Sequence, residues 1–348
     1  MKNVLIVCGP TATGKTKYAL KLAKELDGEL ISADSRQVYK DIPIATNVGN
    51  IKSKKLKVKS KNETSDKKLG TGKERGLNDT YKEVDKNEIS TMSYNLQPNY
   101  LENIPIHLIQ FLELDQSFDV YTWRKLALEK IEEVLNKGKQ PIIVGGTGMY
   151  IDSLVKNYDL KSVEENIDWK ERERLNELKV EELQDMLSNE YKFDLKELNN
   201  SDLNNPRRLI RLIEKKGVRG DEGQVVSGWN KKDYNFRIYY PQYKLDELDL
   251  KISRRVDEMI EEGLVSEVRN AYLKFKAKGY SLEQIKELPG FLVMGVKEIA
   301  ELMNEQEEIA TENIQESISR IKMEHRKYAK RQRTWFEGKT RGYVYEEF

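Results

Sequence analysis

The sequence is poor in cysteine and histidine and has no long apolar run. Its 348 residues include one cysteine, Cys8, and two histidines, His107 and His325. A disulfide framework and a zinc site built from cysteines or several histidines are therefore excluded. No stretch of 18 apolar residues occurs, so we expect no membrane-spanning helix. The N-terminus runs directly into an apolar strand pattern without a leader-like segment, and we expect a cytoplasmic protein.

An excess of charge of one sign is also missing. The 60 Lys and Arg residues are balanced by 59 Asp and Glu residues, which leaves a net charge of +1. The overall field therefore does not indicate a nucleic-acid partner, and any such partner must bind a local basic patch. The chain is long enough for one large domain or two to three smaller ones.

Short apolar runs alternate with amphipathic segments in the first half of the chain. The runs Val4–Cys8, Glu29–Ala33 and Pro141–Val144 predict buried parallel strands, whereas 17–26 and 123–137 have helical spacing. This alternation predicts an α/β fold, with a parallel sheet flanked by helices on both faces.

The predicted organisation has three parts. Residues 1–157 form the α/β core, and residues 158–230 form a helical insertion. Residues 231–348 supply a strand that returns to the sheet, at Arg237–Pro241, and C-terminal helices that pack on the core.

A lysine-rich insertion at residues 50–95 interrupts the core. From Asn50 to Ser90 there are 12 Lys and Arg, 7 Asp and Glu, and few large apolar residues. Such a segment buries too little surface to offset its ordering entropy, so we expect a mobile insertion. It is either a solvated loop without function or a weak, salt-sensitive RNA contact.

The segment after the first strand has the spacing G-x-x-x-x-G-K-T, which is typical of a phosphate-binding loop. Its residues are Gly9, Pro10, Thr11, Ala12, Thr13, Gly14, Lys15 and Thr16. Glycines let backbone N–H groups turn toward phosphate oxygens, and the helix N-terminus adds partial positive charge. Lys15 supplies a charge for a terminal phosphate, and the Thr16 hydroxyl is a Mg²⁺ ligand. The pattern predicts a P-loop NTPase-like sheet that binds a diphosphate or a nucleotide such as ATP, without specifying the reaction.

A carboxylate, Asp34, follows directly after the predicted strand Glu29–Ala33. In open α/β sheets ligands bind beyond the carboxyl ends of the strands, so we expect Asp34 to face the phosphate site. On position alone it is a Mg²⁺ ligand, a general base or the cap of a turn. Thr147 follows the predicted strand 141–144 at the same edge of the sheet. It is either a residue of the site or an ordinary residue of the strand-to-helix turn.

Four further motifs occur in a fixed order along the chain. They are Asp34-Ser35-Arg36-Gln37-Val38-Tyr39 with Ile44-Ala45-Thr46-Asn47, then Pro141 to Tyr150, Asn205 to Arg211, and Tyr328 to Phe336. Together with the phosphate loop they resemble the tRNA dimethylallyltransferase (tRNA isopentenyltransferase) family over most of the chain. His107 stands where many members have two histidines in a row, and we expect it to be structural.

The resemblance implies transfer of a dimethylallyl group from dimethylallyl diphosphate to N6 of adenosine 37, in tRNAs that read codons beginning with U. The loop, Lys15 and Mg²⁺ at Thr16 would stabilise the leaving diphosphate. Asp34 would be the general base, and the Thr147 hydroxyl would contact the target nucleotide. The implied partners of a monomeric enzyme are dimethylallyl diphosphate and a tRNA anticodon stem-loop.

The same resemblance implies a set of tRNA contacts. They are Asp34, Ser35, Arg36, Gln37, Thr147, Arg172, Arg207, Arg208, Leu209, Ile210 and Arg211. Gln37 has the geometry to bind an adenine edge through both amide atoms. The basic residues of 207–211 and of the helix 320–333 are either RNA contacts or solvated helix faces.

Three other functions are compatible with a phosphate loop. A P-loop nucleotide kinase would use the arginines of 207–211 to clamp a nucleotide. An adenylate isopentenyltransferase would prenylate a free nucleotide and would need neither the helical insertion nor a basic C-terminal helix. An RNA-binding nucleotide switch would tolerate replacement of Asp34.

Overall fold

The computed structural model describes residues 1–48, 52–53, 94, 96–156, 169–217, 233–304, 313–338 and 342–348. The predicted insertion at 50–95 lies almost wholly outside these residues. The chain divides into two compact units. The sheet unit comprises residues 2–117, 129–148 and 235–348, and the helical unit comprises residue 1, residues 118–128 and residues 149–234.

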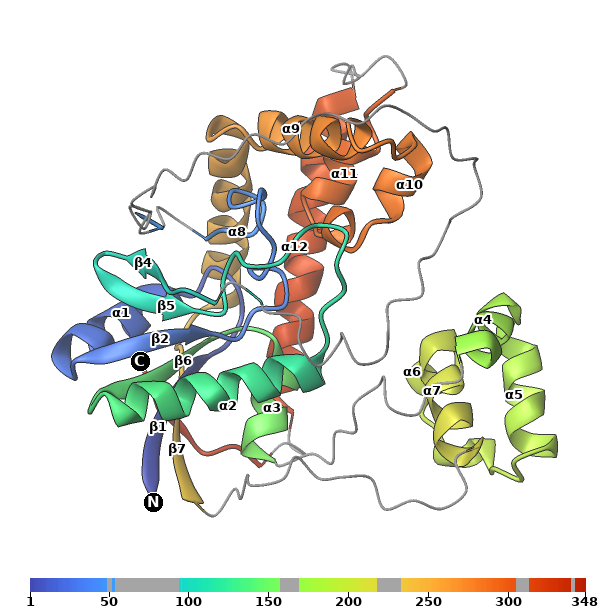
Figure 1. The fold of residues 1–348 in the computed structure, drawn as a ribbon, viewed down its shortest axis with the longest axis horizontal. Coiled ribbons are helices and arrows are strands. Elements are labelled where there is room, and N and C mark those ends of the chain that lie inside the picture. Colours follow the sequence, from blue (N-terminus) through green and yellow to red (C-terminus); the bar gives the residue numbers. More distant parts are fainter. Residues whose placement is uncertain are drawn as a thin grey trace, which may run out of the picture. The chain divides into compact units, whose positions relative to one another are not determined.

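Within the described residues the sheet has eight strands, in the order β3-β4-β5-β2-β6-β1-β7-β8. Figure 1 labels β4, β5, β2, β6, β1 and β7. The strands are β1 (Lys2–Cys8), β2 (Gly28–Ser32), β3 (Lys52–Ser53), β4 (Asn99–Leu101), β5 (Ile104–His107), β6 (Gln140–Gly145), β7 (Tyr234–Tyr240) and β8 (Tyr345–Glu347). The pairs β1–β6, β2–β6, β2–β5 and β7–β8 are parallel, whereas β3–β4 and β4–β5 are antiparallel. A mostly parallel α/β sheet is therefore confirmed.

The face of the sheet beneath α1 (Lys15–Glu25) is apolar because this helix covers it. Helix α1 packs on β1, β2 and β6. Its buried residues, among them Ala19 and Ala23, share one cluster with Val7, Leu30 and Ile142 of the strands. Burial on this scale is the main force that holds the strands in register.

The C-terminal part of the sheet unit is helical, as the sequence predicts. Its helices are α8 (Leu245–Glu261), α9 (Leu264–Lys276), α10 (Leu282–Glu287), α11 (Val296–Ala300) and α12 (Ile314–Glu337). Gly263 and Gly279, both at positive φ, separate α8 from α9 and α9 from α10. Helix α12 is 24 residues long and contacts α8 and α11. Neither α12 nor any other helix of the described residues is long and apolar enough to cross a membrane.

The described part of the predicted insertion at residues 158–230, namely residues 169–217, is helical and lies in the helical unit. Its helices are α3 (Gly148–Val155), α4 (Trp169–Glu177), α5 (Val180–Asn189), α6 (Asn200–Leu203) and α7 (Pro206–Gly217), and α2 (Val120–Asn136) begins in it. Helices α4, α5 and α6 each contact α7 (Figure 1). Their shared core includes Leu183, Leu187, Leu209 and Ile213.

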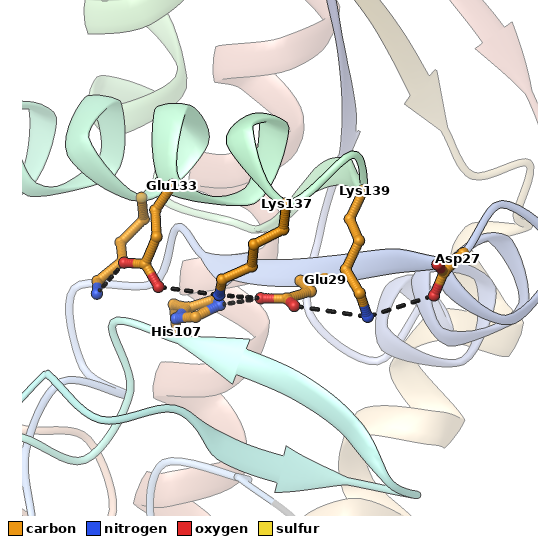
Figure 2. Close-up of polar contacts among 7 residues, drawn as sticks. Asp27, Glu29, His107, Glu133, Lys137 and Lys139 are labelled. Carbon is orange, nitrogen blue, oxygen red and sulfur yellow. Dashed lines mark hydrogen bonds and ion pairs between the residues drawn. The ribbon is translucent and has the colours of Figure 1, made fainter.

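A buried ion-pair cluster joins β2, β5 and the end of α2 (Figure 2). His107 Nε2 lies 2.7 Å from a Glu29 carboxylate oxygen, and Lys137 and Lys139 also contact that carboxylate. Burial lowers the pKa of His107 more than Glu29 raises it. Burial raises the pKa of Glu29, but hydrogen bonds and charge from His107 and Lys137 outweigh it, and the net pKa is lowered. A neutral His107 therefore donates to an ionised Glu29, which fits the structural role predicted for it.

This cluster predicts a pH-dependent stability. Burial lowers the pKa of His325, elsewhere in the sheet unit, as it does that of His107. Both pKa values in the folded protein therefore lie below the value of about 6.5 expected in the unfolded chain. As the pH falls, the unfolded chain binds protons first, and stability is lost below about pH 6.5 at up to about 1.4 kcal/mol per pH unit for each histidine. His107→Gln keeps a donor for Glu29 and should roughly halve this slope between about pH 6.5 and 5. Urea denaturation at a series of pH values measures it; an unchanged slope would contradict a neutral, buried His107.

Candidate active site at one edge of the sheet

Three loops meet at one edge of the sheet because the strands before them are parallel neighbours. Cys8 of β1 pairs with Gly145 of β6, and Ser32 of β2 pairs with Val144. The Ala33 N–H donates to the Val144 carbonyl at 2.8 Å. The phosphate loop, the Asp34 turn and the Thr147 turn thus leave the sheet side by side.

The phosphate loop adopts a conformation that depends on its two glycines. Gly9 has φ +135° and Gly14 has φ +86°, values that L side chains rarely adopt. A Cβ at Gly9 would lie 2.7 Å from Pro241 Cδ, so this position also lacks space for a side chain. Gly14 immediately precedes α1, and the predicted order of strand, loop and helix is confirmed.

Lys15 lies within the loop rather than in solvent. Its Nζ donates to the Pro10 carbonyl. Burial lowers the pKa of Lys15 to about 8, and the charge of Asp34 opposes this shift. A cation is thereby held between the phosphate loop and the Asp34 turn.

Asp34 and Thr147 are brought together, as the strand-end rule predicts. The Thr147 N–H donates to the Ala33 carbonyl at 3.1 Å, and Thr147 Oγ1 accepts from the Ser35 N–H at 3.0 Å. Asp34 Oδ1 accepts from the Arg36 N–H at 2.9 Å, so this carboxylate does cap its own turn. The other oxygen, Oδ2, accepts no hydrogen bond from the described residues, which leaves it able to act as a base.

Helix α12 closes one side of this edge. The Tyr328 side chain hydrogen-bonds Thr147, and the Arg36 guanidinium lies 4.1 Å from the centroid of the Tyr328 ring. Burial, with the charge of Asp34, raises the pKa of Tyr328 to about 12. Tyr328 is therefore a neutral hydrogen-bonding group next to the two residues predicted to be catalytic.

Gln37 is engaged within the protein at both ends of its amide. Its Oε1 accepts from the Ser32 hydroxyl at 3.1 Å, and its Nε2 donates to the Thr46 carbonyl at 3.2 Å. Thr46 belongs to a turn at residues 42–48. The N–H groups of Ile44 and Ala45 in this turn donate to the Glu267 carboxylate at 2.8 and 2.9 Å. Glu267 on α9 thus anchors the turn that holds Gln37.

Thr16, the predicted Mg²⁺ ligand, is exposed in the first turn of α1. In the described part of the chain, no three acidic, histidine or cysteine side chains gather into a metal-binding cluster. A Mg²⁺ ion at Thr16 would take its other ligands from diphosphate and water. This oxygen-only set fits the known preference of Mg²⁺.

The tRNA contacts predicted beyond residue 170 lie in the helical unit. Arg172 and Arg211 pair with Glu214 at 3.3 and 3.4 Å, and Arg208 pairs with Asp202. Arg207 is exposed on α7. Leu209 and Ile210 are buried in the core of the unit, so their side chains hold α7 in place and do not face its surface.

The basic residues of α12 are more extensively paired than the sequence suggests. Arg320 pairs with Glu301 at 2.7 Å, Lys322 with Asp257 at 2.6 Å, and Lys327 with Glu324 at 2.8 Å. Lys330 and Arg331 form no ion pair among the described residues. The Arg331 guanidinium lies 5.7 Å from the centroid of the Tyr328 ring, whereas Lys330 lines a groove that faces Leu248 of α8.

Comparison with known proteins identifies the family. A family model described as IPP transferase matches residues 87–339, and one described as isopentenyl transferase matches residues 2–76. A tRNA dimethylallyltransferase from Acetivibrio thermocellus is 33% identical over 342 residues, which cover 97% of this chain and 89% of the relative. One from Finegoldia magna is 31% identical over 343 residues, which cover 96% and 88%. The chain therefore belongs to the IPP transferase family, and the resemblance inferred from its motifs is confirmed.

Solved structures agree with the fold. The full-length tRNA isopentenylpyrophosphate transferase from Bacillus halodurans has a TM-score of 0.57 and 28% identity, with 100% of this chain and 90% of that chain covered. A eukaryotic dimethylallyltransferase acting on tRNA has a TM-score of 0.63 at 24% identity, with 96% and 70% covered, and supports the fold alone.

Three side chains at this edge were not singled out by the sequence. Tyr328 and Gln332 lie in a motif that was interpreted as a basic helix, although neither is charged. Glu267 is one of 59 acidic residues in the chain, and no local signal distinguishes it from the others. All three make contacts across long sequence separations, which local patterns do not report.

The anchoring role of Glu267 predicts a stability effect. Glu267→Ala leaves the N–H groups of Ile44 and Ala45 without their acceptor and should lower the free energy of unfolding by about 1–3 kcal/mol. Asn270→Ala, an exposed position on the same helix, should change it by less than about 0.5 kcal/mol. Urea denaturation compares the two variants; equal effects would show that Glu267 does not anchor the turn.

Proposed function

We propose that this protein transfers a dimethylallyl group from dimethylallyl diphosphate to N6 of adenosine 37 in tRNAs that read codons beginning with U. The observation that carries the proposal is one sheet edge that joins a phosphate loop and its half-buried lysine, Lys15, to a carboxylate whose Oδ2 accepts no hydrogen bond from the described residues. The charge of Asp34 raises the pKa of Lys15, against the larger effect of burial. Curated relatives at 33% and 31% identity, named tRNA dimethylallyltransferases, support the same activity.

The phosphate loop binds the diphosphate of the donor. The inward N–H groups, the α1 N-terminus and Lys15 stabilise the negative charge that develops as the bond from the allylic carbon to oxygen breaks. Diphosphate leaves with the bonding electron pair. For this, Lys15 exchanges its contact with the Pro10 carbonyl for a phosphate oxygen when the donor binds. The Thr16 hydroxyl would hold Mg²⁺, and the ion would supply further positive charge at the diphosphate when bound.

The Asp34 and Thr147 turns receive the acceptor. The adenine amine forms its bond to the allylic carbon and becomes acidic as it does so, and Asp34 Oδ2 takes the proton. Asp34 Oδ1 keeps its hydrogen bond to the Arg36 N–H, which fixes the carboxylate. The Thr147 hydroxyl, oriented by Ser35 and Tyr328, contacts the target nucleotide.

The helical unit and the end of α12 bind the rest of the tRNA. Arg207, Arg208 and Arg211 lie on one helix, α7, whose core residues hold it rigid. Arg331, beside Tyr328, supplies a cation next to the acceptor turns, and Lys330 supplies one on the side of α12 that faces α8. These groups are suited to phosphates of the anticodon stem-loop. Contacts near the target base fall to Ser35 and Arg36, because the Gln37 amide is engaged within the protein. We propose that the enzyme acts in the cytoplasm as a monomer.

An acceptor assay tests the activity. Protein, Mg²⁺ and labelled dimethylallyl diphosphate are incubated with AMP, or with an anticodon stem-loop that carries adenosines at positions 36 to 38. We expect label in the stem-loop only. Label in AMP alone would instead support an adenylate isopentenyltransferase. Transfer of a phosphoryl group from ATP to a nucleotide, with no prenyl transfer, would support a nucleotide kinase.

Replacement of the base tests the mechanism. Asp34→Asn keeps the Oδ1 acceptor of the turn but cannot take a proton, so kcat should fall roughly 10²–10⁴-fold with stem-loop binding largely intact. Asp27→Asn makes the same chemical change at the other end of β2, at an exposed side chain, and should leave kcat unchanged. Loss of stem-loop binding in Asp34→Asn would assign Asp34 to recognition instead.

A further inference from the structure

Gln332 of α12 connects the two halves of the candidate active site. Its Oε1 accepts from the Thr11 N–H of the phosphate loop at 2.8 Å. Its Nε2 donates to the carbonyl of Gly146, the residue before Thr147, at 3.0 Å. Gln332 is only 5% exposed, so neither hydrogen bond is readily replaced by water.

We propose that Gln332 is a positioning residue for the transfer reaction, and this inference rests on the proposed function. Its amide sets the distance and orientation between the diphosphate cradle and the acceptor turns. Gln332 itself need not touch either substrate. It acts through Thr11 on one loop and through Gly146 on the other.

The chemistry of the bridge requires an amide of this length. One end must accept a hydrogen bond and the other must donate one, and both ends belong to a single planar group. Glutamate would present a second acceptor to the Gly146 carbonyl, and methionine would offer neither bond. The bridge is therefore specific to glutamine and is not a general packing contact.

The partner position is shaped to fit this amide. A Cβ at Gly146 would overlap Gln332 Nε2 and would lie 3.2 Å from the Gly9 carbonyl oxygen. Gly146 is not among the glycines with positive φ, so glycine is needed here for close approach and not for backbone conformation. The turn before Thr147 therefore carries no side chain at the point where α12 and the phosphate loop approach it.

The neighbouring contacts of α12 lie on the same helix face. Tyr328, four residues before Gln332, hydrogen-bonds Thr147. Trp335, three residues after it, packs where a side chain at Gly148 would be. Spacings of four and three residues place the three side chains in one stripe. This stripe gives the bridge a rigid support along both loops.

A fixed separation matters for this reaction. The amine attacks the allylic carbon on the side opposite the departing diphosphate, so both groups must be held in line. A misplacement of about 1 Å can reduce the rate about 10²-fold without preventing binding. Loss of the bridge should therefore lower kcat while each substrate still binds its own loop.

Steady-state kinetics with both substrates tests the inference. Gln332→Met should lower kcat about 10–100-fold, with the KM of dimethylallyl diphosphate and of the stem-loop each changed less than about threefold. Gln315→Met, the same substitution at an exposed position of α12, should leave kcat unchanged. Gly146→Ala displaces the amide from the other side and should reproduce the effect. In the double variant the two losses should not multiply, because both break one bridge.

The outcomes separate this inference from the proposed function. An active wild type with kcat unchanged in Gln332→Met and Gly146→Ala refutes the positioning role alone. A double variant whose losses in kcat multiply refutes it too. So does a fall in kcat that is accompanied by an equal-fold rise in both KM values and by a loss of thermal stability. A wild type that transfers no prenyl group to RNA refutes the proposed function, and the inference falls with it.

Discussion

The arrangement of the site depends on the hydrogen bonds that join β6 to β1 on one side and to β2 on the other. Both pairings are parallel, with Cys8 opposite Gly145 and Ser32 opposite Val144. A shift of register in either pair would move one loop along the sheet edge relative to the others. The apolar side chains buried beneath α1 oppose such a shift, so the hydrophobic core also fixes the relative positions of the reacting groups.

Electrostatics complements this geometry. A lysine ammonium and an aspartate carboxylate interact across the sheet edge, and each has a different proposed partner in the reaction. In the proposed reaction the ammonium compensates charge that forms on a leaving diphosphate, whereas the carboxylate receives a proton from an amine. The two groups would thus respond to opposite charge changes, which suits a transfer reaction better than simple phosphate binding.

Features that depend on neighbouring residues were predictable from the sequence, and long-range pairings were not. The strand β1, its loop and α1 follow from an apolar run, glycine spacing and helical periodicity. The proximity of Asp34 and Thr147 follows from the rule for strand ends. By contrast, β8 is short and polar, and it exists because β7 pairs with it. The ion pairs that Arg320 and Lys322 of α12 form were not predictable, because their partners Glu301 and Asp257 come from other elements. The Gln332 bridge spans 321 residues, beyond any local pattern.

In the proposed reaction one sheet edge holds the donor diphosphate and the acceptor amine in line, with Asp34 beside the amine. A structure of the ternary complex with an anticodon stem-loop and an unreactive thiolo analogue of dimethylallyl diphosphate would show this arrangement. We expect the diphosphate in the loop Gly9–Thr16, the adenine N6 within ~3.5 Å of the allylic carbon, and Asp34 Oδ2 within ~3 Å of N6. A diphosphate outside this loop, or an amine bound away from Asp34, would refute the proposed mechanism.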